Sequence, residues 1–145
     1  MNNLALKGNM PEILDIEAYI KTLPQQEMPI EEYRIDGVYV RSLFIPKDTL
    51  LTGKIHNHEN IAILAQGTIK ICNGNESYEI SAPYIMIDPG GIKRLGYAVT
   101  DVTFITIHKL EQDEEVESLV SDTFEEYEQI VCLGKNEQKL LRRVT

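Results

Sequence analysis

Hydrophobic residues near the start of the chain recur at helical spacing. Between Pro11 and Leu23 the apolar side chains fall mostly three or four positions apart, which is the pattern of a short amphipathic helix. Asn9 is available as the N-cap, Pro11 stands in the first turn, and Pro24 stops the pattern. We predict a helix from Pro11 to Leu23, within an N-terminal helical arm of residues 1–30.

From Tyr33 to His108 the pattern changes to short runs rich in β-branched residues. The clearest runs are Val38 to Ile45, Asn60 to Ala65, Thr68 to Cys72 and Val102 to His108. Turn residues separate them, as at Asp36-Gly37, Asn73-Gly74-Asn75 and Pro89-Gly90-Gly91. Strands and turns at this spacing predict an antiparallel sandwich or barrel over residues 31–110, and the absence of helical patterns between the strands excludes a parallel α/β sheet.

The remaining residues, 111–145, predict an acidic helical extension followed by a tail. Apolar positions between Val116 and Tyr127 would give a helix one apolar stripe. Thr123 and Glu126 have the spacing of a capping box, so one broken helix and two short helices are both compatible with the pattern. The basic end, Lys139 to Arg143, would either fray or pair with the acidic stretch of a neighbouring subunit.

Charge is distributed unevenly along the chain. The formal net charge is −9, which argues against a general nucleic-acid binder. Residues 111–130 contain nine Asp and Glu and no Lys or Arg, whereas residues 31–110 contain nine acidic and eight basic side chains. A locally cationic site within the β-rich region is therefore compatible with the acidic total.

The composition also constrains the compartment. The chain has no apolar run of the ~20 residues that a membrane-spanning helix needs, and its start mixes Asp and Glu with apolar residues, unlike a secretory signal. Cys72 and Cys132 are far apart in sequence, so they form neither a disulfide framework nor a zinc ligand set. We predict a single-domain cytoplasmic protein that makes no membrane contact.

Two stretches carry candidate chemistry. The first runs from Ile45 to Gly67 and contains Gly53-Lys54-Ile55-His56-Asn57-His58-Glu59, and the second runs from Tyr84 to Tyr97 and contains Pro89-Gly90-Gly91-Ile92-Lys93-Arg94. Together they resemble the two motifs of the cupin superfamily, over about residues 38 to 108. The resemblance implies a mainly β fold, a double-stranded β-helix or jelly-roll barrel with short flanking α-helices, and a metal site built from inward-pointing side chains.

The first motif fits the family in two registers. Anchored on Gly67, the family's first histidine becomes Lys54, its second becomes His56, and its glutamate becomes Asn60. Anchored instead on His56 and His58, the glutamate falls on Ala62 or Ile63, neither of which binds a metal. Both registers lose the carboxylate.

The second motif departs from the family at its metal ligand. Arg94, or Lys93 after a shift of one residue, stands where the family has its last histidine. Cations at ligand positions repel a divalent metal. A metal site would then have to use His56, His58 and Glu59, with His108 as a further ligand.

The replacements predict a cationic pocket instead. In a regular strand Lys54 and His56 share a face, which the register through Gly67 makes the interior, and Arg94 would approach from a neighbouring strand. His108 shares a face with Thr106 and would project into the same mouth. Such a set would hold an anion such as a phosphate or a carboxylate.

Each of these residues also has a simpler interpretation. Tyr97 or Tyr84 would line the ligand or merely pack in the barrel. Arg94 would otherwise pair with Asp88 or Asp101 at the surface, His108 would merely end a strand, and His56 and His58 would form a solvated turn.

The sequence thus leaves three functions open. The first is a small-molecule-binding protein whose Lys54, His56, Arg94, Tyr97 and His108 hold an anionic ligand such as a nucleotide. The second is a cupin enzyme, an oxygenase, isomerase or lyase, whose cofactor is a divalent metal on His56, His58 and Glu59, or a metal-free enzyme with His56 or His108 as the catalytic base. The third is a non-catalytic structural or assembly protein.

The same motifs are similar to small uncharacterised cupin-like proteins of tailed bacteriophages. That resemblance implies a phage origin, a location in the host cytoplasm and action on a host metabolite or signal, without naming a substrate. The apolar-striped flanking segments need surfaces to cover, so we expect a homodimer or larger homo-oligomer.

Overall fold

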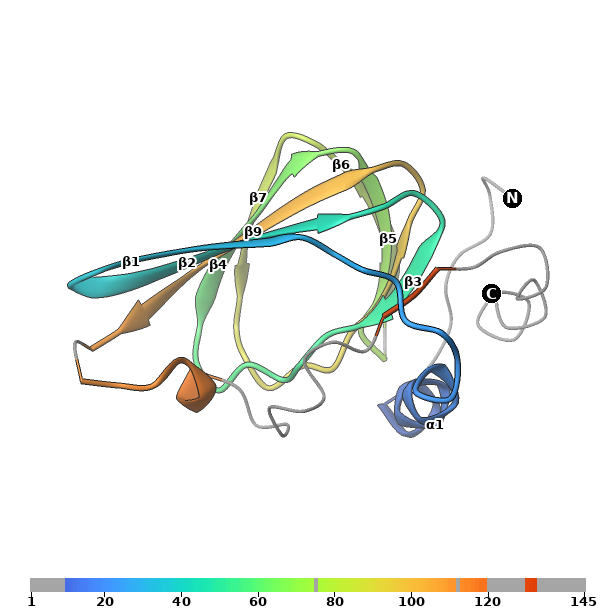
Figure 1. The fold of residues 1–145 in the computed structure, drawn as a ribbon, viewed down its shortest axis with the longest axis horizontal. Coiled ribbons are helices and arrows are strands. Elements are labelled where there is room, and N and C mark those ends of the chain that lie inside the picture. Colours follow the sequence, from blue (N-terminus) through green and yellow to red (C-terminus); the bar gives the residue numbers. More distant parts are fainter. Residues whose placement is uncertain (1–9, 75, 112, 120–129, 133–145) are drawn as a thin grey trace.

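The computed structural model describes residues 10–74, 76–111, 113–119 and 130–132 (Figure 1). The described part contains one α-helix, α1 (Met10–Ile20), and one 3-10 turn, η1 (Val116–Leu119). Its strands are β1 (Ile30–Ile35), β2 (Gly37–Ile45), β3 (Thr49–Thr52), β4 (Asn60–Gln66), β5 (Thr68–Cys72), β6 (Ser77–Ser81), β7 (Tyr84–Asp88), β8 (Leu95–Ala98), β9 (Val102–Leu110) and β10 (Ile130–Cys132).

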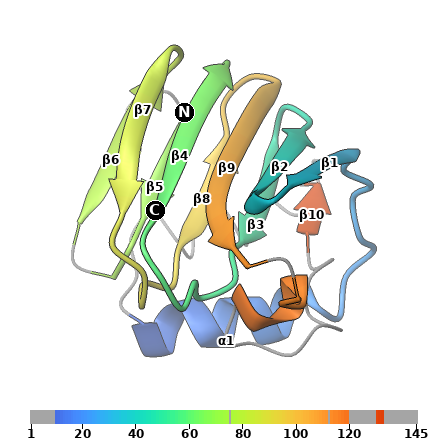
Figure 2. The same cartoon turned by 90° about the vertical axis from the view of Figure 1, so that its left-hand side faces the viewer.

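The strands form two antiparallel sheets. One sheet has the order β1-β2-β9-β4-β7, and we call it the front sheet because it faces the viewer in Figure 2. The other, the back sheet, has the order β10-β3-β8-β5-β6. The mainly β fold predicted from the sequence is confirmed, and the four clearest predicted strands correspond to β2, β4, β5 and β9.

A hydrophobic core fills the space between the sheets. Inward-facing residues alternate along the strands, as at Ile45 on β2, Leu64 on β4 and Val102 on β9, each no more than 2% exposed. From the back sheet, Ile69 and Ile71 of β5 pack against them. This core occupies one end of the interior, and the candidate site occupies the other.

Helix α1 covers the outer face of the back sheet (Figure 1). Its stripe of Ile13, Ile16 and Ile20 is buried to 3% exposure or less and packs with Leu50 of β3 and Leu95 of β8. The predicted stripe is therefore real, although the α-helix ends at Ile20 rather than Leu23, because the chain leaves it in a hydrogen-bonded turn.

A buried ion pair fixes the helix to the barrel. Nζ of Lys93, only 1% exposed, lies 2.6 Å from Oε2 of Glu17 on α1, and the Thr52 hydroxyl donates to the same oxygen. A buried charge needs such a partner, because leaving it unpaired in the interior costs several kcal/mol, roughly 3–5. Lys93 therefore belongs to the scaffold and does not line the cavity.

The C-terminal extension differs from the predicted helix where the structure describes it. Val116–Leu119 is a 3-10 turn packed on Tyr39 and Leu110, and Ile130–Cys132 is a strand paired with β3. The segment is used to extend the back sheet, which the acidic pattern did not suggest. The rest of the predicted helix, from residue 120 to 129, and the basic end Lys139 to Arg143 lie outside the described residues. Within the described residues, no helix is long and apolar enough to cross a membrane.

Candidate functional site

Two loops at one end of the barrel carry the residues of both motifs. The loop of residues 53–59 connects β3 to β4, and the loop of residues 89–94 connects β7 to β8. Backbone hydrogen bonds join the loops, from the Gly91 amide to the His56 carbonyl at 2.8 Å and from the Gly53 amide to the Arg94 carbonyl at 3.0 Å. The two motifs, distant in sequence, therefore form one structural unit.

Gly90 permits this close approach. Its φ of +82° lies in the left-handed region, and a Cβ there would lie 3.2 Å from backbone atoms of His58. Its amide donates to Oδ1 of Asp88 at 2.9 Å. The turn after β7 thus also orients the Asp88 carboxylate.

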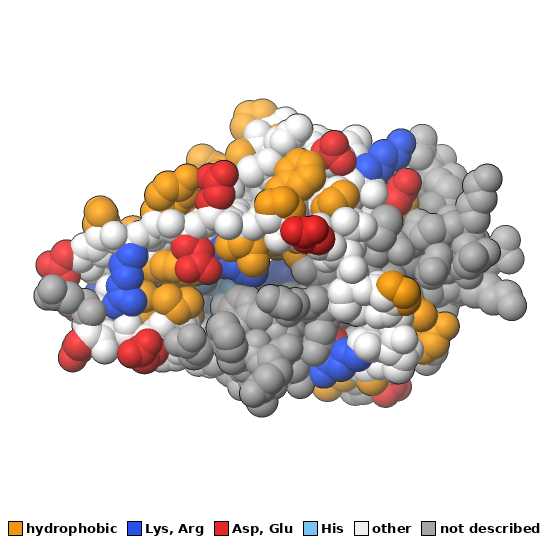
Figure 3. Space-filling model, viewed as in Figure 1, with side chains coloured by type: hydrophobic (Ala, Val, Ile, Leu, Met, Phe, Trp, Pro, Cys, Tyr) orange, Lys and Arg blue, Asp and Glu red, His pale blue; other side chains and the backbone are white. Residues whose placement is uncertain are grey.

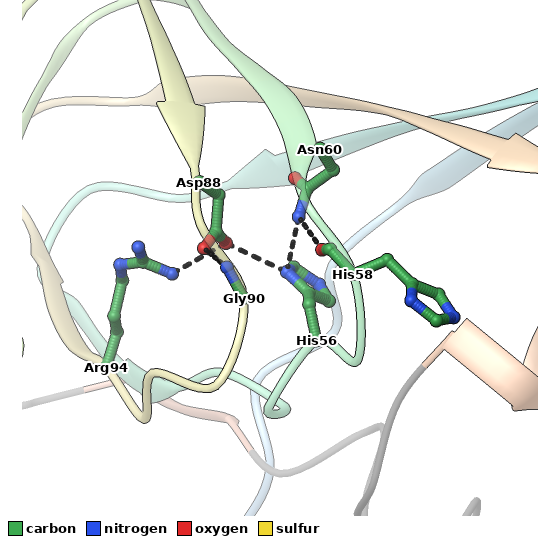
Figure 4. A network of polar contacts seen from close by, with 6 residues as sticks. All are labelled: His56, His58, Asn60, Asp88, Gly90 and Arg94. Atoms are coloured by element: carbon green, nitrogen blue, oxygen red, sulfur yellow. Dashed lines mark hydrogen bonds and ion pairs between the residues drawn. The ribbon is translucent and has the colours of Figure 1, made fainter.

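Asp88 is the centre of a polar network (Figure 4). Its Oδ2 lies 3.0 Å from Nδ1 of His56 and accepts a 2.8 Å hydrogen bond from Nη1 of Arg94. Asn60 places its Nδ2 3.2 Å from the same histidine nitrogen. Arg94 therefore pairs with Asp88, as one interpretation of the sequence had it, but within the site rather than out on the surface.

Asp88 is ionised despite its burial. Burial opposes the charged form, but hydrogen bonds from His56 and Arg94, the Gly90 amide and the positive charge of Arg94 outweigh it and hold the pKa of Asp88 well below its usual range. An ionised carboxylate can only accept, so Nδ1 of His56 carries the hydrogen and donates it. The other ring nitrogen, Nε2, is then the basic one.

A cavity of about 140 Å³ adjoins this network. Its polar lining residues are Arg41, Thr52, Lys54, His56, Asp88, Arg94 and Thr106. Its apolar lining residues are Met28, Leu43, Ile45, Leu51, Ala62, Ile69, Ile71, Met86, Leu95 and Phe104, with Gly53 and Gly96. In the space-filling view, a hollow near the middle of the molecule shows Lys or Arg and His side chains at its bottom (Figure 3).

The cavity brings together three residues that the sequence singled out, Lys54, His56 and Arg94. Strand β3 ends at Thr52, so Lys54 and His56 reach the cavity from a loop rather than from the regular strand we expected. The sequence reasoning did not select Arg41. The pattern that could have identified Arg41 is the alternation of side chains along β2, in which residues 39, 41, 43 and 45 share the inward face.

His108 lies behind the cavity rather than in its lining. It is 6% exposed, and its ring meets the His56 ring edge-on with centroids 5.1 Å apart and the Tyr39 ring at 6.0 Å. Burial, followed by the charges of His56 and Arg41, lowers the pKa of His108 to about 4, with Asp88 opposing. His108 is therefore neutral near pH 7 and supports His56 sterically.

The two tyrosines that the sequence suggested lie outside the cavity lining. Tyr97 is 8% exposed and packs in the cluster beneath α1, where its hydroxyl donates to Oδ1 of Asp48 at 2.8 Å. It points to the outer side of the back sheet because neighbouring residues on a strand face opposite sides, and Gly96 faces inward. Tyr84 is 43% exposed at the start of β7.

The described side chains do not fit the divalent metal that the motif resemblance implies. No three of the described His, Cys, Asp and Glu side chains come together in a group that could hold an ion. His58 and Glu59 are exposed, and the His58 ring is turned away from His56 and Asp88 (Figure 4). Arg94 also places a permanent cation beside Asp88, the one carboxylate that the described part of the chain contributes to the cavity lining.

Comparisons with known proteins establish the fold alone. No protein-family model and no curated protein matches the chain. Among solved structures, ectoine synthase from P. lautus is 16% identical with a TM-score of 0.52, over 61% of this chain and 70% of that chain. KdgF from Halomonas sp. is 12% identical with a TM-score of 0.50, over 64% and 93% of the two chains.

A third structure carries the fold name. It is a cupin superfamily protein from Desulfitobacterium hafniense, 8% identical with a TM-score of 0.50, over 61% of this chain and 83% of that one. The protein described here therefore has the cupin fold, a jelly roll of two antiparallel sheets, with one short α-helix among the described residues. These likenesses do not bear on the resemblance to phage proteins.

Proposed function

We propose that this protein binds a small anionic molecule in the cavity between its sheets. The observation that supports the proposal is the convergence of three cationic side chains on one cavity: Arg41 from β2, Lys54 from the first motif loop and Arg94 from the second. Asp88 is the only carboxylate among the described lining residues, so these residues carry a net positive charge. Cations around a partly apolar cavity attract an anion more strongly than the same cations in bulk water would.

A thermal-shift panel tests the proposal. Mono-, di- and cyclic nucleotides, sugar phosphates, inorganic phosphate and carboxylates are screened at low and high salt, because a ligand that binds only the folded state raises the melting temperature. Hits should weaken with salt, and each lost charged hydrogen bond, worth roughly 1.5–3 kcal/mol, should weaken binding by about 10- to 150-fold.

Substitutions locate the binding. Lys54→Ala and Arg41→Ala should weaken every hit, whereas Lys109→Ala, at a side chain 83% exposed and outside the cavity, should leave affinity unchanged. A panel in which no anion binds, or in which hits survive both cavity substitutions, contradicts the proposal. A nucleotide ligand, a phage origin and a cytoplasmic location stay predictions.

One contact favours a second candidate, a metal-free acid–base enzyme. The Asp88 carboxylate fixes the His56 ring and leaves Nε2 as the base, an arrangement in which a histidine can take a proton from a bound molecule. Hits from the panel incubated in D2O should then exchange a carbon-bound hydrogen for deuterium, detected by NMR. Exchange that persists at the same rate in His56→Gln would eliminate this candidate.

A further inference from the structure

The polarity of the barrel interior changes along the strands. On the front sheet Arg41 of β2 is paired with Thr106 of β9, and both line the cavity. Two residues further along, the inward pair is Leu43 and Phe104, and beyond it Ile45 faces the core. The cavity therefore has a polar end at the motif loops and an apolar end toward the core.

The opposite wall is apolar too. Leu51 of β3 and both Ile69 and Ile71 of β5 line the cavity from the back sheet. The charged lining residues all lie on β2, at the end of β7 or on the two loops, so no described charge lies at the apolar end. An ion at the apolar end would lose its water of hydration and gain no oppositely charged or hydrogen-bonding partner. The free energy of that transfer is unfavourable by several kcal/mol or more.

The size of the cavity limits the ligand. Its volume of about 140 Å³ is close to that of an engineered apolar cavity of roughly 150 Å³ that accommodates benzene. The whole cavity, with its polar end included, thus fits a ligand not much larger than benzene, and it is too small for the combined sugar and base of a nucleotide.

Arg94 has a donor to spare at the polar end. Its Nη1 is engaged by Asp88, while its Nε is buried and has no hydrogen-bond partner. Buried N–H groups are almost always satisfied, so an unsatisfied one beside a cavity indicates an acceptor supplied by a ligand. A carboxylate oxygen is a suitable acceptor for this planar group.

From these observations we infer that the ligand is an amphipathic monocarboxylic acid of about six or seven carbons in all, with an aliphatic or aromatic body, an inference that rests on the proposed anion-binding function. The carboxylate binds Arg94, Lys54 and Arg41, and the apolar body lies between Phe104 and Ile71. A monoanion suits the site better than a dianion, because Asp88 repels additional negative charge.

Isothermal titration of a homologous series tests the inference. Acetate, butyrate, hexanoate and benzoate are compared with hexanol, phenyl phosphate, inorganic phosphate and AMP. Each methylene should tighten binding by about fourfold, so hexanoate should exceed acetate by about 200-fold. Hexanol should bind at least 10-fold more weakly than hexanoate, because it lacks the charge.

A matched pair of substitutions distinguishes a contact between the ligand and the apolar end of the cavity from a general effect of substitution on the fold. Leu43 of β2 lines the cavity in the apolar row beside Phe104, whereas Leu14 of α1 is 44% exposed and lies outside the cavity. Leu43→Phe should weaken hexanoate by about 10-fold and leave acetate unchanged, and Leu14→Phe should alter neither. Circular dichroism of both variants verifies folding.

The outcomes distinguish the two proposals. Anions that bind with no dependence on chain length, or phosphate, phenyl phosphate or AMP that binds more tightly than every carboxylate, would overturn this inference and leave the proposed function standing. Failure of every anion to bind would overturn both.

A second inference concerns the outer face of the front sheet. Branched apolar residues lie side by side across neighbouring strands in two rows: Val40, Ile107, Ile61 and Ile87 in one, and Ile105, Ile63 and Ile85 in the other. We call these seven residues the isoleucine face. Ile85 and Ile87 are 68% and 70% exposed, and Ile61 is 42% exposed.

The two outer faces of the barrel differ in how they are covered. The back sheet is covered by α1, which buries Leu50 and Leu95. On the front sheet, neither α1 nor any other described element lies over the strands facing the viewer (Figure 2). An exposed apolar patch of this extent on a folded domain marks an interaction surface.

The chemistry of the isoleucine face favours a second copy of the chain as the partner. Its rows contain no charged residue, so a charged or nucleic-acid partner would gain nothing there. Strands about 4.8 Å apart, and rising ~3.4 Å per residue, give the whole outer face of the five-stranded front sheet, of which the isoleucine face is the apolar centre, a projected area of roughly 600 Å². That projected area is of the order of the ~800 Å² per partner that a stable complex buries.

We propose that two copies of this chain pack their isoleucine faces together as aligned sheets. Aligned sheets pack about 10 Å apart with their side chains interdigitated, and branched residues suit that arrangement. The two copies would leave both cavity mouths open, because the motif loops lie at the ends of the strands rather than on the isoleucine face.

Light scattering coupled to size exclusion, at about 100 µM, tests this proposal. The unmodified chain should elute at twice its 16.5 kDa mass. Ile61→Lys with Ile87→Lys should give a folded monomer, whereas Leu14→Lys, at a position 44% exposed on α1, should stay dimeric. A monomeric unmodified chain, or an oligomer that survives the double substitution, would overturn the proposal.

Discussion

Lowering the pH should destabilise the protein through His108, before its carboxylates are affected. The imidazole is 6% exposed and its pKa is lowered to about 4, from the ordinary value of 6.5. Between these values the unfolded chain binds a proton at this residue and the folded chain does not. Stability therefore rises with pH across this interval and falls as the pH is lowered.

The expected magnitude follows from linkage. Taking the pH from 7.5 to 5.0 should cost about 2 kcal/mol at His108, since one pKa unit is worth about 1.4 kcal/mol and most of the interval is traversed. Asp88, whose pKa is also lowered, contributes in the same sense, but only below the unfolded-state value near 4, so it adds little between pH 7.5 and 5.0.

Urea unfolding at each pH measures the effect. Tyrosine fluorescence or far-ultraviolet circular dichroism is the signal, because the chain has seven Tyr and no Trp. His108→Leu keeps the site apolar and removes the titration, so its stability should change by about 2 kcal/mol less than that of the unmodified chain. His58→Ala, at an exposed histidine, is the matched control and should retain the full dependence. An unchanged pH dependence in His108→Leu would refute the reasoning.

Three further predictions concern the scaffold. Lys93→Met should cost roughly 3–5 kcal/mol in urea unfolding because it leaves Glu17 buried without its cation, and adding Glu17→Leu should recover most of that loss. Gly67→Ala should cost ~3 kcal/mol or more, since its φ is +87° and a Cβ would clash with the Asp101 carbonyl oxygen; a melting temperature equal to that of the unmodified chain would contradict this. Ile13→Ala should cost about 2–5 kcal/mol by emptying the contact between α1 and the back sheet, and thermal unfolding measures it.

The strands that could be predicted from the sequence are those in which inward-facing and outward-facing side chains alternate over enough residues for the pattern to be recognised. β2 and β9 contain nine residues each, and every second one faces inward. β8, Leu95–Ala98, is buried on both faces, because α1 covers one and the second sheet covers the other. Its alternation carries no information, which is why Tyr97 was expected in the cavity and lies beneath the helix instead.

The candidate site was predictable only in part. Lys54, His56 and Arg94 could be selected because they stand at motif positions. Asp88 could be named only as one of two surface partners for Arg94, because its contact with His56 arises where β7 ends beside β4. Arg41 lies outside both motifs, and its place in the cavity follows from the pairing of β2 with β9. Such contacts depend on strand register, which local patterns do not specify.

The buried pair of Glu17 and Lys93 also has a consequence for synthesis of the chain. Helix α1 leaves the ribosome before its partners on β3, β5 and β8, and Lys93 follows Glu17 by about 75 residues. At ~5–20 residues per second the helix waits roughly 4–15 s with its apolar stripe unburied. The helix then packs onto the back sheet from outside, so a fragment that begins at β1 would expose Leu50, Leu95 and Lys93 to water.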